Sequence, residues 1–279
     1  RLNLEVPLAG QPEELQGETR PVDAPLWGVP RPPPVGADGR PLRRLVSSAR
    51  PSPGLAASGA EGLAGGGCYG FLRPPNPRPP TSRHNLKPQD VRVQVGQLKL
   101  YDGDQLTKVK QIIRHPKYLG FAKGGADIAL LQLEAPLTLS ARVNVVGTPS
   151  ATLKVPKGKR CSVTGWGNIK HNLSLPPPYH LQEVEVPIVA NKVCNKHYRT
   201  GPNSKPIKAD MLCAGSKGLD SCQGDSGGPL MCSWNGTWVQ VGIVSWGRGC
   251  GLHNFPGVYI RVMSYVSWIY QYVPRSPGP

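Results

Sequence analysis

Short apolar runs with alternating polar positions follow one another between residues 91 and 273. Gly, Pro and Asn, which favour turns, separate them. The runs include "VRVQVGQLKL", "VKQIIRH", "DIALLQLEAPL", "RCSVTGWG", "LQEVEVPIV", "TWVQVGIVSWG" and "GVYIRV". Alternation indicates β-strands, and many short strands joined by turns are typical of an antiparallel barrel or sandwich.

The last apolar segment, "MSYVSWIYQYV" over residues 263–273, has helical spacing instead. Tyr265, Trp268, Ile269 and Tyr272 fall on one face of a helix with 3.6 residues per turn. We therefore expect a C-terminal amphipathic helix whose aromatic side chains pack against the domain.

Composition divides the chain. Residues 1–90 hold 17 of its 32 prolines and 12 of its 34 glycines, a level typical of chain that cannot build a core. We expect a Pro/Gly-rich segment over residues 1–85 that is disordered or non-native. A globular domain over residues 86–275 and a tail over residues 276–279 follow it.

The globular part is also the basic part. Residues 91–279 contain 22 Lys or Arg against 9 Asp or Glu, which leaves an excess of +13. Such a surface attracts polyanions, so sulfated polysaccharide is an admissible partner. We do not expect nucleic-acid binding, because the chain has no zinc-knuckle spacing and no aromatic RNA-binding motif.

Cysteines and sequons indicate an oxidising compartment. Six of the seven cysteines follow residue 160, and the tripeptides that begin at Asn172 and Asn235 are glycosylation sequons. No apolar stretch approaches the ~20 residues of a membrane span. The chain begins at Arg1 without a methionine or an apolar leader, so we expect a secreted protein whose signal peptide has been removed or lost.

The stretch "DSCQGDSGGPL", which ends at Leu230, contains the strongest candidate chemistry. A serine nucleophile needs a base, an orienting acid and donors for the developing oxyanion. Ser226 could be that nucleophile. The N–H groups of Gly224 and Ser226 could form the oxyanion hole, because Gly224 has no Cβ to block the approach. A plain turn between strands is the alternative interpretation of the same glycines.

Four ordered motifs remove this ambiguity. "DIALLQL", "TGWG", "GDSGGPL" and "VSWGRGC" with "PGVY" resemble the trypsin-like serine proteases of the chymotrypsin fold. "LPPPYHLQEVEVPIV" and "VQVGQLKLYDGDQL" resemble their mast-cell branch, the tryptases and mastin. The resemblance covers residues 86–275. It implies an all-β fold of two antiparallel barrels, of which the first is incomplete here, with a C-terminal helix.

The resemblance also assigns roles. It implies that Ser226 is the nucleophile and that Asp127 orients a catalytic histidine. Asp220 matches the base of the primary specificity pocket, where a carboxylate attracts Arg or Lys side chains. The remaining substrate-binding matches are Gly247 and Gly257 on the pocket walls, and Ser245 and Trp246 on the strand that pairs with substrate.

Disulfides follow by the same matching. The resemblance implies that Cys161 pairs with Cys232, Cys194 with Cys213, and Cys222 with Cys250. It assigns no partner to Cys68. The family normally has one more bridge beside its catalytic histidine. Neither the "AAHC" motif nor that bridge is present in this sequence. The resemblance implies neither a cofactor nor a metal ion.

The catalytic histidine is not matched. His84 lies 43 residues before Asp127, a separation comparable to the family's. However, it follows "FLRPPNPRPP", and a proline-rich run cannot supply the hydrogen bonds of the expected strand. His115 sits in a structural segment of the family. His171, His180, His197 and His253 follow Asp127 in regions where the family has surface loops.

The start of the domain is unmatched as well. The resemblance implies an ion pair between Asp225 and the α-ammonium of an Ile-Val-Gly-Gly-like terminus, and only "RRLVSSA" approaches that pattern. We therefore expect Asp225 to stay unpaired or to find another partner. Three explanations remain for residues 1–85. They are foreign sequence in place of the true start, which we favour, a spliced product that yields a dead pseudoprotease, or a proline-rich linker.

Two functions remain open. One is an endopeptidase that cleaves after Arg or Lys through an acyl-enzyme, although we expect negligible turnover from the chain as written. The other is a secreted, catalytically dead pseudoprotease that binds a polyanionic polysaccharide or a protein partner. The resemblance further suggests storage in secretory granules, self-association into a homo-oligomer, and binding of heparin-like polysaccharide and protease inhibitors.

Overall fold

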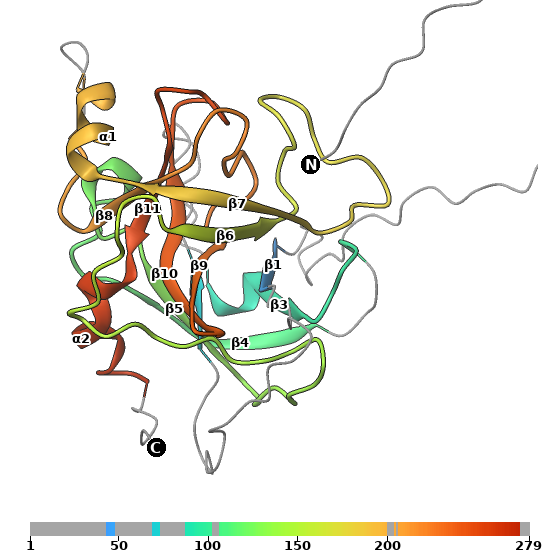
Figure 1. The fold of residues 1–279 in the computed structure, drawn as a ribbon. Helices are drawn as coiled ribbons and strands as arrows, with labels where there is room; N and C mark the ends of the chain where they lie inside the picture. Colours follow the sequence, from blue (N-terminus) through green and yellow to red (C-terminus); the bar gives the residue numbers. More distant parts are fainter. Residues whose placement is uncertain are drawn as a thin grey trace, which may run out of the picture. The chain divides into compact units, whose positions relative to one another are not determined.

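The structure is a computed structural model that describes residues 87–101, 106–199, 204 and 206–273, together with the backbone of residues 43–47 and 69–72 (Figure 1). Its strands are β1 (Arg43–Ser47), β2 (Tyr69–Leu72), β3 (Val91–Val95), β4 (Thr107–Arg114), β5 (Ala129–Leu133), β6 (Arg160–Gly165), β7 (Gln182–Val189), β8 (Met211–Ala214), β9 (Pro229–Trp234), β10 (Thr237–Trp246) and β11 (Gly257–Arg261). Its helices are η1 (Pro88–Asp90), η2 (Ala122–Gly124), α1 (Asn191–Tyr198), η3 (Val262–Tyr265) and α2 (Val266–Ile269).

Six strands close into a barrel in the order β10-β11-β8-β7-β6-β9, and every neighbouring pair in it is antiparallel. Most barrel strands are buried over several consecutive residues, and only β7 alternates between buried and more exposed positions in its second half. Val186, Leu230, Val241 and Tyr259 are completely buried in its core. The complete second barrel expected from the sequence is therefore present.

The other sheet is open, with the order β1-β3-β4-β5-β2. β3, β4 and β5 pair antiparallel, and Val91, Val109 and Leu131 are buried between them. β1 pairs parallel with β3, which differs from the all-antiparallel arrangement that we expected. β1 and β2 come from residues 1–85, so these two stretches are strands, and the rest of residues 1–85, Cys68 included, lies outside the described residues.

A shared apolar cluster joins the sheet to the barrel. Ile128 and Leu130 from the sheet pack with Ile243 and Ile260 from the barrel, and Trp268 covers them. Because all of these side chains are almost fully buried, the sheet and the barrel cannot separate without exposing a large apolar surface. Asp127 lies at the start of this junction.

The C-terminal segment is helical but shorter in its α-helical part than the sequence predicts. It begins as the 3₁₀ turn η3 and continues as α2, which ends at Ile269. Beyond it, Gln271 and Tyr272 donate to carbonyls three residues back, a tighter pattern that ends helices. Tyr265, Trp268 and Ile269 are buried as predicted, whereas Tyr272 is 40% exposed because it lies in this last turn.

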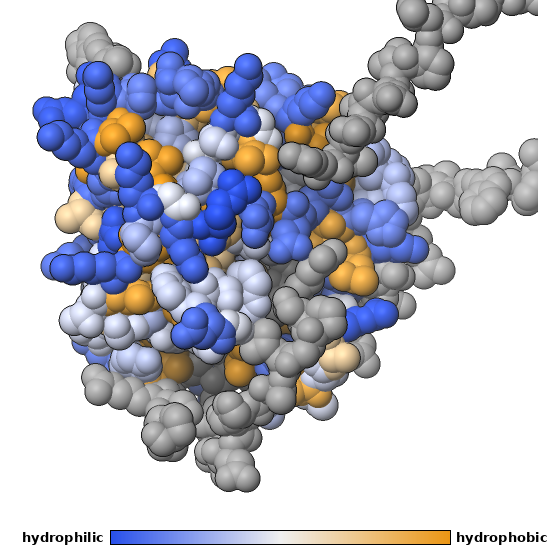
Figure 2. Space-filling model, viewed as in Figure 1, coloured by the Kyte–Doolittle hydropathy of each residue, from blue (hydrophilic) through white to orange (hydrophobic). Residues whose placement is uncertain are grey.

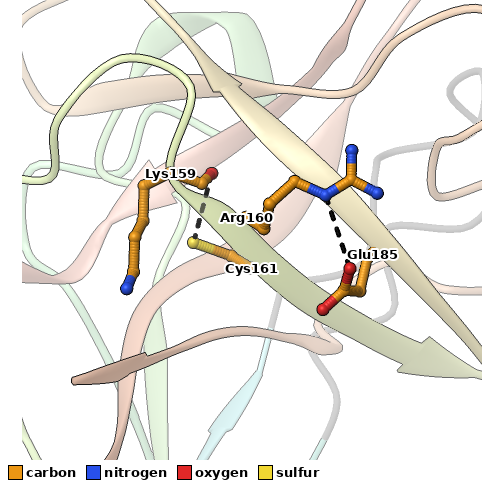
Figure 3. Close-up of polar contacts among 4 residues, drawn as sticks. All are labelled: Lys159, Arg160, Cys161 and Glu185. Atoms are coloured by element: carbon orange, nitrogen blue, oxygen red, sulfur yellow. Dashed lines mark hydrogen bonds and ion pairs between the residues drawn. The ribbon is translucent and has the colours of Figure 1, made fainter. Parts of the chain in front are cut away.

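Polar side chains cover much of the outer surface. Figure 2 shows hydrophilic residues over most of one face, with smaller apolar areas between them. On the barrel, Arg160 Nε of β6 lies 3.4 Å from Glu185 Oε2 of β7, in an ion pair more than half exposed (Figure 3). In the described part of the chain, no helix is long and apolar enough to cross a membrane.

Candidate active site

A glycine turn presents Ser226 at the surface, immediately before β9. The Gly228 N–H donates to the Asp225 carbonyl over 2.8 Å, and the Gly227 N–H donates to the Val244 carbonyl of β10 over 2.8 Å. A Cβ at Gly228 would lie 2.8 Å from that Asp225 carbonyl oxygen, so only glycine fits. The turn therefore holds Ser226 exposed beside the end of β10.

Gly224 lies in the same turn with φ +100°, a conformation that L side chains rarely adopt. A Cβ at this position would come within 2.9 Å of the Gly167 Cα. The close approach brings the "TGWG" loop against the segment before the serine. Both the positive φ and the contact require glycine, which is a backbone reason for the first glycine of "GDSGG".

Asp127 is completely buried at the entry to β5. Its Oδ2 accepts a 2.6 Å hydrogen bond from the hydroxyl of Ser245, which is itself 1% exposed on β10. A hydrogen bond of this length is typical of a hydroxyl that donates to a carboxylate. Val244 bonds to the turn that carries Ser226, and Ser245 bonds to Asp127, so two successive residues of β10 hold the two segments that carry these groups.

Asp220 is a second, partly buried acid on the barrel side. Its Oδ1 accepts from the Ser221 N–H at 2.8 Å, and its Oδ2 accepts from the Gly251 N–H at 3.0 Å. Burial raises the pKa of Asp220 to about 7 in spite of these hydrogen bonds and that of Gly257, and the neighbouring Asp225 adds to the rise. A cation that approaches this carboxyl would stabilise its ionised form.

Glycines surround Asp220. A Cβ at Gly257 would lie 2.5 Å from Asp220 Oδ1, and a Cβ at Gly247 would lie 3.9 Å from the Gly257 Cα. Beyond them stands Tyr198 of α1, whose hydroxyl donates to the Pro256 carbonyl at 2.9 Å and accepts from the Arg248 N–H at 3.3 Å. Any side chain at Gly257 would therefore intrude on the carboxylate.

Asp225 has backbone partners. Its Oδ1 accepts from the Gly167 N–H at 2.8 Å and its Oδ2 from the Cys222 N–H at 2.9 Å. Burial raises the pKa of Asp225, and these two hydrogen bonds oppose the rise. Among the residues that the structure describes, it makes no ion pair. The two backbone N–H groups of Gly167 and Cys222 are the hydrogen-bond donors that the described residues show for Asp225.

The described histidines lie in five different settings. The His115 ring packs edge-on against Tyr265 and Trp268, with centroids 4.9 Å away in each case, and burial lowers its pKa. His171 Nδ1 lies 3.2 Å from the Gln223 amide nitrogen. The other three are His180, in a bridge with Lys99, His197, beside Phe255, and His253, in an exposed loop. His84 lies outside the described residues.

The three disulfides have the pairings that the resemblance implies. They join Cys161 to Cys232, Cys194 to Cys213, and Cys222 to Cys250. The Cys161 sulfur also contacts the Lys159 carbonyl oxygen at 3.9 Å (Figure 3). Both sequon asparagines, Asn172 and Asn235, are exposed in turns. The described residues contain no cluster of ligating side chains that could hold a metal ion.

Several residues of the site are missing from the sequence interpretation. Tyr198 closes the region behind Gly247, and the buried Tyr259 donates its hydroxyl hydrogen to the Ser221 Oγ over 3.2 Å. Asp210 Oδ2 accepts from the Ala126 N–H at 2.9 Å and from the Tyr265 hydroxyl, and so fixes the peptide before Asp127. Tyr259 ends the "PGVY" motif, but the sequence assigned it no role. Tyr198 and Asp210 act through contacts between distant segments, which a local pattern does not show.

Comparison with known proteins assigns the family. The family model described as Trypsin matches residues 76–269, a range that begins ten residues earlier than we expected and includes His84. A tryptase of Mus musculus is 50% identical over 193 residues, which is 68% of this chain and 70% of the relative. Serine protease 28 of Mus musculus is 40% identical over 202 residues, which is 69% and 73% of the two chains. The chain therefore belongs to the trypsin family of serine endopeptidases, within its tryptase branch.

Proposed function

We propose that the site recognises Arg and Lys side chains through Asp220 and that the family chemistry at Ser226 cleaves the peptide bond that follows them. The environment of Asp220 supports this proposal. A partly buried carboxyl with a pKa of about 7, held by backbone N–H groups and bordered by glycines, lacks a cationic partner among the described residues. A guanidinium or ammonium ion would supply one.

The reaction would use the groups already described. Ser226 would attack the substrate carbonyl, and the N–H groups of Gly224 and Ser226 would stabilise the oxyanion. Asp127, with its hydrogen bond from Ser245, would stabilise the protonated form of a base. The second half of the mechanism is water attack on the acyl-enzyme, which returns Ser226.

We further propose that this chain turns over substrate very slowly. The sequence contains no Ala-Ala-His-Cys motif, and the loss of the base of such a triad lowers the rate by several orders of magnitude. Binding and turnover would then be separated in this chain. Ligands with a basic side chain would still bind.

Binding of p-aminobenzamidine, a fluorescent amidinium, tests the pocket without requiring catalysis. We expect the wild-type chain to bind it, and we expect Asp220→Asn to weaken binding by at least about 30-fold, because a buried charge pair loses one partner. Glu185→Gln removes the same charge from an exposed pair on β7 and should leave the affinity unchanged. Equal binding by wild type and Asp220→Asn would contradict the proposed specificity.

Hydrolysis of an arginine ester tests turnover. We expect the purified chain to differ little from its Ser226→Ala variant. Robust hydrolysis that Ser226→Ala abolishes would contradict the proposed inactivity and would show that a base reaches the serine.

The basic excess of residues 91–279 supports a second candidate function, the binding of a sulfated polysaccharide by a secreted protein glycosylated at Asn172 and Asn235. Retention on a heparin column that weakens steeply with salt would support it. Elution at the ionic strength of a neutral protein would exclude it.

A further inference from the structure

The proposed function leaves open which residues the ligand carries before its basic side chain. The path of β10 bears on this question. The register between β9 and β10 ends with Pro229 opposite Ile243, and the serine turn then bonds to Val244. After Val244, no strand in the described part of the chain pairs with residues 245–247 on the side of β10 that β9 occupies. These residues form an open strand edge beside Ser226.

An open edge of this kind can accept an extended peptide as an additional strand. Gly247 lies next to Gly257, which lies against the Asp220 carboxylate. A peptide with its cation at Asp220 and its carbonyl at Ser226 would therefore carry its preceding residues along residues 245–247. They would pass over the partly buried ring of Trp246.

Two exposed cations flank this edge. Lys123 Nζ lies 5.4 Å from the centroid of the Trp246 ring, within the range of a cation–π contact. Arg248 follows Trp246 by two residues, and its guanidinium carbon lies 4.6 Å from the centroid of the Phe255 ring. Within the described residues, neither cation forms an ion pair with a carboxylate.

The acids near this edge are already engaged. Asp127 accepts from Ser245, Asp220 accepts from two backbone N–H groups, and Asp210 accepts from Ala126 and Tyr265. A third cation, Lys208, adds to the positive charge, because its Nζ donates to the Gly124 carbonyl of η2. A ligand that enters along residues 245–247 therefore meets cations that have aromatic and backbone contacts but no anion.

We infer that the site selects acidic peptides, in which Asp or Glu precedes the basic residue held by Asp220, with Lys123 and Arg248 as the specificity-determining cations. This inference rests on the proposed function of Asp220. The cations contribute through partly screened charge pairs, so the preference is a matter of a few-fold in affinity rather than an absolute requirement.

Two matched ligands without a scissile bond test the inference. Acetyl-Asp-Asp-agmatine and acetyl-Asn-Asn-agmatine differ only in their two carboxylates, and each carries the guanidinium for Asp220. Their affinities are measured by displacement of p-aminobenzamidine at low ionic strength. We expect the acidic ligand to bind about fivefold more tightly, and we expect this ratio to approach one in about 0.5 M NaCl, where exposed charges are screened.

Charge reversal locates the preference. Lys123→Glu should make the acidic ligand the weaker one, while the affinity for p-aminobenzamidine stays unchanged and so reports an intact pocket. Arg248→Gln should reduce the ratio without reversing it. Lys157→Glu, in the exposed turn before β6, changes the net charge equally and should leave the ratio as in the wild type.

The outcomes separate the two proposals. Equal affinities of the two ligands in a chain that binds p-aminobenzamidine would overturn the acidic preference and leave the pocket standing. The same ratio in Lys123→Glu and Lys157→Glu would also overturn it, because a general field effect would then explain the preference. Failure of all three ligands to bind would contradict the pocket itself, and the inference would fall with it.

Discussion

The closed barrel and the open sheet contribute to the site in different ways. The barrel carries Ser226, Asp220 and all three disulfides, and its strands pair with two neighbours each. Asp127 lies two residues before β5 of the sheet, and one neighbour of that strand, β2, is a short segment from residues 1–85. The ligand recognition that we propose at Asp220 would therefore depend on the more constrained part of the molecule. The orientation of a base that we propose for Asp127 would depend on the less constrained part.

Core truncation tests this contrast and should have the largest effect. Leu230→Ala removes a completely buried side chain from the barrel and should lower the free energy of unfolding by about 2–5 kcal/mol. Leu133→Ala in the sheet should lie at the lower end of that range, because an open sheet can collapse around the cavity. Urea denaturation measures both. A larger loss of unfolding free energy in Leu133→Ala than in Leu230→Ala would mean that the sheet, and not the barrel, is the more constrained part.

Ser245→Ala tests the link between the two parts. The variant removes the donor of the 2.6 Å hydrogen bond to the buried Asp127 carboxylate, which should lower the free energy of unfolding by about 1–3 kcal/mol. Ser233→Ala, on β9 of the same barrel, removes a hydroxyl for which the described residues show no hydrogen bond and should change it little. Denaturant titration of both variants is the measurement, and equal losses would argue against the importance of this link.

The pH dependence of ligand binding tests the barrel side alone. Because the pKa of Asp220 is raised to about 7, the carboxyl is mostly neutral at pH 6 and mostly ionised at pH 8. Binding of p-aminobenzamidine should therefore strengthen by about tenfold between these pH values. Asp220→Asn should flatten the profile, and an equally steep profile in that variant would assign the titration to another group.

The raised pKa of Asp220 affects stability in the opposite direction: ligand binding strengthens as the pH rises, whereas the free energy of unfolding falls. A carboxyl whose folded pKa exceeds its unfolded value of about 3.9 binds its proton more tightly in the folded protein. Its contribution to stability is complete below pH 4 and is lost as the pH rises through about 7. Without ligand, the unfolding free energy of the wild type should therefore fall relative to that of Asp220→Asn as the pH rises over this window.

The smallest effect is expected at the surface of the barrel. Arg160→Ala breaks an ion pair in which both side chains are more than half exposed, so the free energy of unfolding should change by less than about 0.5 kcal/mol. Thermal denaturation at low and high salt measures it. A loss of several kcal/mol would mean that the barrel depends on its outer surface more than its buried core suggests.

The sequence predicted the elements of the barrel better than those of the sheet. Alternation was clear in β7, where polar residues separate apolar ones, whereas β10 was predictable from its long apolar run, which is buried at six consecutive positions. α1 was not predicted, because only Cys194 and Tyr198 are buried along it, and one pair at helical spacing is a weak signal. β1 and β2 escaped prediction because they lie in sequence with no apolar periodicity of useful length.

The site was predictable where a residue type is forced by the backbone. Gly224, Gly228 and Gly257 stand where a Cβ would meet another atom within 3 Å, so a short motif records a spatial constraint. Asp210 and Tyr198 could not be found in this way. Their partners lie 84 and 58 residues away in the chain, and only the folded structure brings them together.

The meeting of two partners on successive residues of β10 makes the site sensitive to the length of one strand. Side chains alternate between the two faces of a strand, so deletion of a single residue before Val244 would exchange their directions. The hydroxyl that now reaches Asp127 would face the opposite way, and the carbonyl that anchors the serine turn would move by a full residue. The deletion of one residue would therefore misplace both the Asp127 contact and the serine turn, although every side chain named above would still be present in the chain.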